Sequence, residues 1–393
     1  MDCQAFESSP VGSLRRITGH DAYLRKDYDH FAFVPNELPA SLPLEPLSYK
    51  MASEAEREVG RLDASTKRLP NPKLLVRPAL IREAVSTSAL EGTYAPLIEV
   101  LEADYLEATQ RRSEVREILN WIEAAERGIE LIAHKPLCVT MFNELQQILV
   151  HGTHGDGADA GQLRNGQVFI GQRHDGIERS RYVPPPAGEL LIAGVDAWER
   201  WINEDHHFPL VVKLALTHYQ FETLHPYHDG NGRLGRLIAV LQLITAKAIE
   251  YPLLNLSPWL EPRKERYKDL MLQVSMTGDF DPWVQFFAEA VRASALEAVS
   301  RVDRLIDFRT HVLDQLKSDR ARGVVLDVVD DLISYPLVSI SQVAAKNGVT
   351  YPPAAGAIER LTRLGFLEEI TGRSYGRVFA CHQVMQIVNE PAS

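Results

Sequence analysis

The segment 221–236, FETLHPYHDGNGRLGR, constrains the fold more than any other part of the chain. An apolar run with helical spacing leads into it after Pro209, carried by Val211, Leu214, Ala215 and His218. A second apolar run follows it from Leu234 to Leu243. The glycines between the two runs favour a tight turn. The pattern therefore predicts two buried helices joined by a short glycine-containing loop.

The same loop has the composition of an anion site. Gly230 and Gly232 flank Asn231 and allow backbone N–H groups to approach an anion closely. The loop also leads into a helix amino terminus, which favours phosphate. Arg233 and Arg236 add guanidinium groups whose geometry suits phosphate oxygens. We therefore expect a bound nucleotide or phosphate ester here.

Two further residues suggest that this loop takes part in catalysis. Asp229 is out of place in a pure anion site, but a carboxylate beside phosphates can hold Mg²⁺. His225 precedes the loop and could take a proton from an attacking hydroxyl. Taken singly, His225 is more often a core or capping histidine and Asp229 a turn residue. Their combination with the glycines and arginines favours catalysis.

The segment resembles the signature of the Fic family, H-P-[FY]-x-[DE]-G-N-G-R-x-x-R, at every fixed position. The resemblance implies an α-helical transferase that uses ATP with Mg²⁺ and moves AMP onto a protein hydroxyl. It makes His225 the general base and Asp229 the metal ligand. It assigns ATP binding to Asp229, Gly230, Asn231, Gly232, Arg233 and Arg236, with Arg236 on the γ-phosphate.

A second resemblance lies at residues 77–93, RPALIREAVSTSALEGT. Pro78 can start a helix there and Gly92 can end it, which leaves Glu91 at the negative end of the helix dipole. The segment is similar to the inhibitory helix motif [ST]-x-x-x-E-[GN], with Thr87, Glu91 and Gly92 in the matching positions. This implies that Glu91 pairs with Arg236 and blocks the productive γ-phosphate pose. The alternative is a solvated glutamate before a capping glycine.

Two more elements are expected near the site. The segments 168–171 and 181–183, separated by turn-forming residues, predict a β-hairpin. Its place matches the flap on which Fic proteins dock a target, which would involve Phe169, Ile170, Gly171, Tyr182 and Val183. A simple solvent-facing hairpin is the alternative. Tyr267 stands where relatives place an aromatic residue near adenine, although a core tyrosine is equally compatible.

The resulting fold class is mainly α: a Fic-type helical bundle with a β-hairpin flap, plus a small winged helix-turn-helix domain. We expect an amino-terminal arm over 1–75, a catalytic domain over 76–295 with its inhibitory helix at about 78–92, a connecting helix over 296–319, and the winged-helix domain over 320–393. In that last domain we expect a short helix at 338–345, a second helix from Thr350 to Gly365, and a strand pair around 366–370 and 377–380.

The winged-helix domain leaves a regulatory role open. Its presumed second helix carries Arg360 and Arg363 near its middle, which is a poor phosphate-binding stripe. A structural or dimerising role is therefore favoured over DNA binding. Another class of function, a DNA-binding regulator whose Fic core senses nucleotide, remains an alternative, as does a Fic-type transferase of UMP, phosphate or phosphocholine.

Composition narrows the partners. The net charge of −11 disfavours general binding of nucleic acid or anionic membranes. No secretory signal or membrane-spanning segment is visible, and the three cysteines lack metal-ligand spacing. We expect a cytoplasmic protein that uses ATP, acts on an unidentified protein or on itself, and is compatible with a homodimer.

Overall fold

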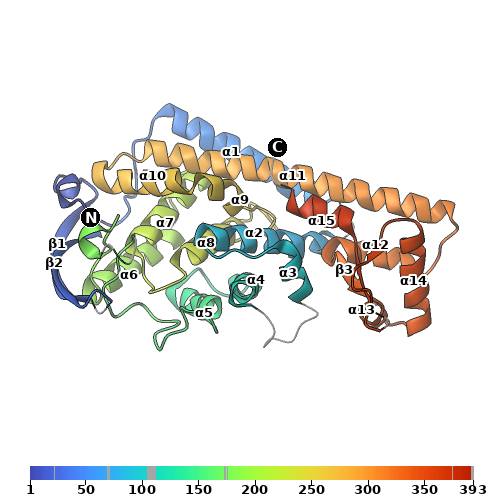
Figure 1. Cartoon of the computed structure of the whole chain (residues 1–393). Coiled ribbons are helices and arrows are strands. Elements are labelled where there is room, and N and C mark those ends of the chain that lie inside the picture. The colour runs from blue at the N-terminus through green and yellow to red at the C-terminus, as the bar shows by residue number, and fades with distance from the viewer. Residues whose placement is uncertain are drawn as a thin grey trace.

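The computed structural model describes residues 1–21, 23–68, 71–103, 112–171, 174, 176–373 and 375–390. Most of them are helical, which confirms the mainly α fold class. Figure 1 shows an elongated molecule with a β-hairpin at one end and a smaller unit of helices and short strands at the other. Among the described helices, none is both long and apolar enough to cross a membrane.

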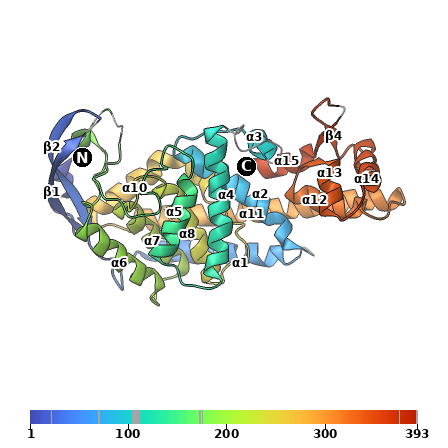
Figure 2. The same ribbon diagram turned by 90° about the horizontal axis from the view of Figure 1, so that it is seen from below.

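The central part of the chain is a helical bundle. Its α-helices are α1 (Pro46–Thr66), α2 (Val76–Leu90), α3 (Leu97–Glu102), α4 (Ser113–Ile132), α5 (Val139–Val150), α6 (Glu189–Asn203), α7 (Leu210–Leu224), α8 (Asn231–Thr245), α9 (Ser257–Leu260), α10 (Lys264–Thr277) and α11 (Asp281–Ser318). Figure 2 shows α4 and α5 lying in front of α8 on one face of the bundle.

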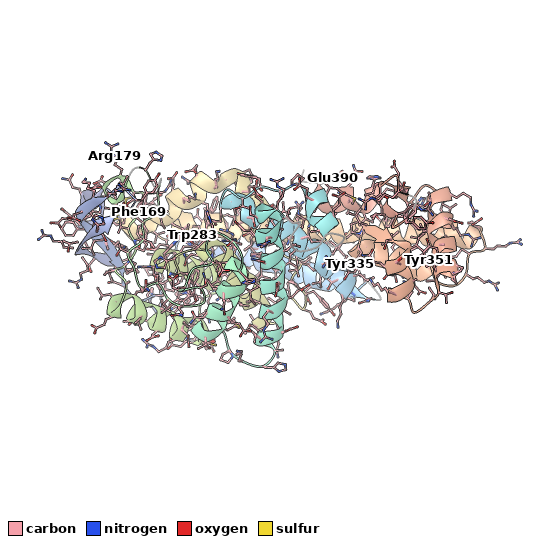
Figure 3. All side chains as sticks on the ribbon, turned by 60° about the horizontal axis from the view of Figure 1, so that its bottom comes forward. Phe169, Arg179, Trp283, Tyr335, Tyr351 and Glu390 are labelled. Atoms are coloured by element: carbon pink, nitrogen blue, oxygen red, sulfur yellow. The ribbon has the colours of Figure 1, made fainter. Side chains whose placement is uncertain are left out.

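Helices α7 and α8 form the centre of this bundle. Both are buried around most of their circumference, because their sequences are apolar on nearly every face. Trp283 of α11 lies in the interior (Figure 3), and its indole N–H donates to the carbonyl oxygen of Ala215 at 2.9 Å. The predicted pair of buried helices around the glycine loop is therefore present.

Helix α11 corrects one predicted boundary. The expected connecting helix over 296–319 is the second half of a single helix that begins at Asp281. No glycine or proline occurs between Pro282 and Gly323, so nothing in the sequence stops the helix at residue 295. Figure 1 shows α11 running beside α1 and on to the carboxy-terminal unit.

The amino-terminal arm contains a hairpin that the sequence patterns did not predict. Strands β1 (Gly12–Asp21) and β2 (Lys26–Pro35) pair antiparallel from Gly12 opposite Pro35 to Asp21 opposite Lys26. The N–H of Phe33 in β2 donates to the carbonyl oxygen of Val183 at 2.9 Å. The amino-terminal hairpin thus supports the segment expected to be the flap.

That segment differs from the regular β-hairpin expected over 168–183. It has one isolated antiparallel bridge, between Ile170 and Tyr182, and the 3-10 helix η6 (Ile177–Arg179) between them. The second half of the predicted hairpin bonds to β2 through Val183, and three prolines follow it, so a longer ladder does not form. Residues 172, 173 and 175 of the expected turn lie outside the described residues.

The carboxy-terminal unit contains the two helices and the strand pair expected from the sequence, together with two helices and a strand that the sequence analysis did not predict. It contains α12 (Val325–Ser334), β3 (Leu337–Ser339), α13 (Ile340–Lys346), α14 (Tyr351–Arg363), β4 (Glu368–Glu369), β5 (Val378–Ala380) and α15 (His382–Asn389), with the antiparallel sheet order β3-β5-β4. The helix expected at 338–345 begins instead at Ile340. The reason is a capping box in which the Ser339 and Gln342 side chains satisfy each other's backbone N–H groups.

This unit packs against α2 and against the residues just before it. The guanidinium of Arg82 donates to the carbonyl oxygen of Val388 at 3.1 Å, and the hydroxyl of Ser334 donates to that of Leu74 at 2.8 Å. Arg360 and Arg363 of α14 both contact the carboxylate of Asp319. The positive charges of these two arginines, which we considered for DNA binding, are therefore partly neutralised by Asp319.

Candidate active site

A pocket opens between the end of α2, the segment around Ile170, α7, the start of α8, and α10. Seven of the residues predicted from the sequence line it: Glu91, Ile170, Tyr182, His225, Gly232, Arg236 and Tyr267. The anion loop, the proposed base and the proposed inhibitory residue thus meet in one cavity, although they come from segments up to 145 residues apart.

His225 ends α7 in an unusual backbone conformation. Its φ and ψ are 48° and 62°, in the left-handed region that residues other than glycine adopt uncommonly. The turn directs the chain from α7 into the glycine loop and leaves the imidazole lining the pocket. Burial and the positive charge of Arg164 lower the pKa of His225 to about 4. The imidazole is therefore neutral at pH 7 and able to accept a proton.

We expect the imidazole of His225 to titrate well below an ordinary histidine, whose pKa is about 6.5. In the free protein labelled with ¹³C-histidine, its NMR signal should keep the neutral chemical shift down to about pH 5. The spectrum of the His225→Asn variant assigns the signal. A midpoint near the ordinary value would show that the imidazole is solvated and that our description of its surroundings is wrong.

The loop residues divide into two roles. Gly232 lines the pocket, and a Cβ there would lie 2.1 Å from the Glu91 carboxylate and 3.0 Å from an Arg236 nitrogen, so a side chain would require the Glu91 carboxylate to move. Gly230 has a φ of +81° and forms the turn before α8. The side chain of Asn231 exchanges hydrogen bonds with both backbone groups of Tyr227, at 2.9 and 2.7 Å. Asn231 therefore braces the loop, and its backbone N–H belongs to the start of α8.

Arg233 is also a brace in this structure. Its guanidinium is buried and contacts the carboxylates of Glu117 at 3.3 Å and Asp229 at 3.2 Å. Asp229 additionally accepts the N–H of Gly230 at 2.7 Å. Neither Arg233 nor Asp229 lines the pocket described above, although both lie on the adjoining turn. Their contacts with ATP stay predictions.

Asp229 suits the role of a single protein ligand to Mg²⁺. Its side chain is 47% exposed beside the phosphate loop, and a Cβ at the facing Gly155 would lie 2.3 Å from its carboxylate. Among the described residues, no group of three or more potential ligands gathers around a common point. That donor set fits Mg²⁺ brought in with a nucleotide, because phosphate oxygens and water then supply the other ligands.

Arg236 is held by the end of α2. Its Nη2 lies 2.6 Å from the Glu91 carboxylate, and its Nε donates to the hydroxyl of Thr87 at 2.7 Å. Burial disfavours the Arg236 charge, but the carboxylate of Glu91 more than offsets this and raises its pKa. Partial burial of Glu91 opposes ionisation, yet Arg236 keeps its pKa below the ordinary value. Gly92 follows with a φ of +96° and ends the helix.

Removing the Thr87 hydroxyl should destabilise the protein. In Thr87→Val the buried Nε of Arg236 loses its acceptor, and an unpaired buried donor costs about 1–3 kcal/mol. We expect the free energy of unfolding, measured by urea denaturation, to fall by that amount. The matched control is Thr310→Val on the exposed face of α11, for which a change within about 0.5 kcal/mol is expected. Equal effects in both variants would contradict the anchoring role of Thr87.

The predicted flap residues are only partly accessible. Ile170 lines the pocket and Gly171 is exposed, whereas Val183 is fully buried and Tyr182 nearly so. The hydroxyl of Tyr182 donates to the carbonyl oxygen of Thr223 at 3.0 Å. Tyr182 and Val183 therefore anchor this segment, and Val183 has no exposed surface to offer a target. Phe169 is half-buried at the hairpin end of the molecule (Figure 3).

Tyr267 lies at the Arg236 end of the pocket. Its ring is buried against Trp283 and His218, and its hydroxyl is 2.7 Å from the His218 ring nitrogen. The alternative weighed from the sequence, a core tyrosine, therefore describes its ring, while its contact with a nucleotide stays a prediction.

Sequence reasoning missed three charged residues of the pocket, Glu222, Arg181 and Lys268. Glu222 lies one turn before His225 on α7, and burial raises its pKa to about 7. Arg181 binds the carboxylates of Glu265 and Asp269 and thereby connects the segment around Ile170 to α10 at the edge of the pocket. Lys268 of α10 adds a positive charge to the pocket lining. Helical spacing from His225 could have indicated Glu222. No sequence signal placed Arg181 beside α10.

Together, the fold and the site define a class of protein: a helical bundle in which a glycine loop, a half-buried histidine and a buried arginine surround one pocket. Comparison with known families assigns residues 49–130 to the Fic/DOC family N-terminal domain and residues 136–243 to the Fic/DOC family domain. These two stretches of the chain are therefore similar to the Fic/DOC family, and the second of them contains the signature at residues 221–236.

Curated relatives cover part of the chain. It is 31% identical over 183 residues to the protein adenylyltransferase Fic of Drosophila virilis, which is 44% of this chain and 34% of the relative. It is 34% identical over 139 residues to the Drosophila yakuba protein of the same name, which is 35% of this chain and 24% of the relative. The matched region thus spans about a quarter to a third of these relatives.

Solved structures support the fold over a larger share. A Fic family protein from Desulfovibrio desulfuricans G20 superimposes with a TM-score of 0.57 at 20% identity, covering 86% of this chain and 97% of that one. A single-residue variant of a Fic-1 fragment from C. elegans gives a TM-score of 0.50 at 18% identity, covering 66% and 74% of the two chains. At these identities the likeness supports the fold alone.

Proposed function

We propose that this chain is a protein adenylyltransferase, which moves AMP from ATP to a serine, threonine or tyrosine hydroxyl of a target protein or of itself. One observation carries the proposal: a neutral, half-buried His225 lines the same pocket as Gly232 and Arg236, beside the start of α8, which can receive phosphates. The curated relatives that share this region are named adenylyltransferases.

The residues suggest a direct displacement at the α-phosphorus. The target hydroxyl gives its proton to the imidazole of His225 and its oxygen forms a bond to the α-phosphorus. The bond from that phosphorus to the bridging oxygen breaks, and pyrophosphate leaves. The N–H groups at the start of α8 and the guanidinium of Arg236 stabilise the phosphate charge. Asp229 would hold Mg²⁺, which neutralises part of the phosphate charge when bound.

The contact between Glu91 and Arg236 supports a second part of the proposal, that α2 is an inhibitory helix. A carboxylate oxygen of Glu91 lies 2.6 Å from a guanidinium nitrogen of Arg236. This nitrogen therefore cannot bind a γ-phosphate at the same time. The carboxylate also lies where a phosphate beside Gly232 would be repelled. The protein would therefore bind ATP in a poorly reactive pose until Glu91 moves.

The carboxy-terminal unit supports a structural role. Its helices α13 and α14 and its three-stranded sheet support the winged helix expected from the sequence, but Asp319 binds both arginines of α14. The unit instead contacts Arg82 of α2 through Val388, and Leu74 just before α2 through Ser334. We therefore propose that it steadies the inhibitory helix, and we do not favour DNA binding.

The identity of the transferred group can be tested with labelled nucleotides. The Glu91→Gly protein would be incubated with Mg²⁺ and ATP labelled at the α- or γ-phosphorus, or with UTP labelled at the α-phosphorus. Protein-bound label from α-labelled ATP alone supports AMP transfer. Label from γ-labelled ATP would indicate phosphate transfer, and label from UTP would indicate UMP transfer. Either result would overturn the adenylyltransferase assignment.

A further inference from the structure

Arg164 is a buried cation that the proposed chemistry does not use. Its side chain is 2% exposed. Among the described residues, no carboxylate lies within ion-pair distance of its guanidinium, and burial lowers its pKa to about 10. A buried charge without a counter-ion is unfavourable unless several hydrogen bonds offset the loss of water. The hydrogen-bond partners of this guanidinium therefore indicate what the buried charge does.

All of those partners are backbone carbonyl groups, and two of them belong to the turn that carries His225. The Nε of Arg164 donates to the carbonyl oxygen of His225 at 2.8 Å, and one Nη2 hydrogen bond goes to that of Leu224 at 3.4 Å. The backbone N–H of Arg164 donates to the carbonyl oxygen of Pro226 at 2.9 Å. One arginine thus binds three successive carbonyl groups, those of the residues before, at and after the bend.

The other half of the guanidinium binds the base of the segment that includes Ile170. Nη1 donates to the carbonyl oxygen of Gly166 at 3.0 Å, and Nη2 donates to that of Pro185. These residues flank the bridge between Ile170 and Tyr182. Arg164 therefore connects the wall of the pocket to the turn that carries His225.

The left-handed backbone conformation of His225 explains why these hydrogen bonds matter. Left-handed φ and ψ values are unfavourable for histidine by roughly 1–2 kcal/mol, so the surrounding structure must hold the turn. The hydrogen bond from Arg164 to the His225 carbonyl group acts directly on that peptide unit. A relaxed turn would carry the imidazole away from Gly232, and even a displacement of about 1 Å can cost roughly 100-fold in rate.

We propose that Arg164 is a positioning residue for transfer: it holds His225 in its left-handed conformation and fixes the turn to the pocket wall. The proposal rests on the adenylyltransferase function proposed above. It assigns Arg164 no contact with the substrate. Removing Arg164 should therefore lower the rate of the chemical step and leave nucleotide binding nearly unchanged.

The test uses Arg164→Lys and Arg164→Met in the full-length Glu91→Gly protein. Lysine keeps the charge but cannot reach several carbonyl groups at once, and methionine keeps the bulk without the charge. We expect kcat to fall at least 10-fold in both, with the dissociation constant for a non-hydrolysable ATP analogue within about threefold of the parent. The matched control is Arg179→Met, since Arg179 is exposed on the nearby η6 (Figure 3) and its loss should not change kcat.

A double-mutant cycle separates positioning from general damage. If Arg164 acts through His225, Arg164→Lys should not lower the residual rate further when His225 is already asparagine. A merely structural role would lower both backgrounds by the same factor and would overturn the proposal, as would parental kcat in both Arg164 variants. If the Glu91→Gly parent itself transfers no AMP, the proposed function fails before Arg164 is tested.

Discussion

Replacing His225 by asparagine is expected to lower the rate of AMP transfer by about 10²- to 10⁴-fold, the usual contribution of a general base. Asparagine is the informative substitution because it tolerates the left-handed conformation that His225 adopts and cannot accept the hydroxyl proton at neutral pH. The rate would be measured as label transfer in the Glu91→Gly background, together with ATP affinity by calorimetry.

His228→Asn is the matched control for this experiment. His228 lies three residues further along, is partly exposed, and pairs with Asp159 at 3.0 Å outside the pocket. Its replacement should change the rate by less than about threefold. A His225→Asn protein that transfers AMP within threefold of its parent would rule out His225 as the base. Loss of ATP binding in that variant would point instead to a damaged loop.

Replacing Glu91 by glycine is expected to raise the rate of transfer about 10- to 100-fold, the range of a typical coupling free energy between two states of a site. The variant removes the carboxylate that lies 2.6 Å from Arg236, while Thr87 still holds the guanidinium in place. Arg236 is then free to bind a γ-phosphate in the pocket. Steady-state label transfer at saturating ATP measures the change.

Glu102→Gly is the matched control for the charge and for the glycine. Glu102 is the exposed last residue of α3, and it neither contacts Arg236 nor lines the pocket. It should leave the rate unchanged. An equal rate in wild type and Glu91→Gly would show that the contact between Glu91 and Arg236 does not limit transfer.

The sequence predicted the parts of the site that depend on short-range spacing. The turn after α7, the glycine loop and the start of α8 are contiguous, and residues 221–236 specify them through helical periodicity and glycine placement. The pairing of Glu91 with Arg236 came from the family resemblance, because no local pattern links residues 145 positions apart. The distance between these two side chains became known only from the three-dimensional structure.

The rest depended on contacts that a single sequence does not reveal. The hairpin β1–β2 consists largely of charged and polar residues, so its strands lack a strong apolar alternation. The flap prediction recognised the segments around Ile170 and Tyr182 but not that Val183 would bind β2 and limit the pairing to one bridge. Arg164 looks like any loop arginine until the carbonyl groups that it contacts are brought together.

The central claim is that this pocket transfers AMP with His225 as base and Glu91 as inhibitor. Mass spectrometry after incubation with ATP and Mg²⁺ tests it most directly, on wild type, Glu91→Gly, and Glu91→Gly with His225→Asn. The account predicts a mass gain of one AMP on hydroxyl side chains of the protein or an added target, weak in wild type, strong in the single variant and absent in the double variant. An AMP adduct that is equally abundant in all three proteins, or a different adduct, would contradict it.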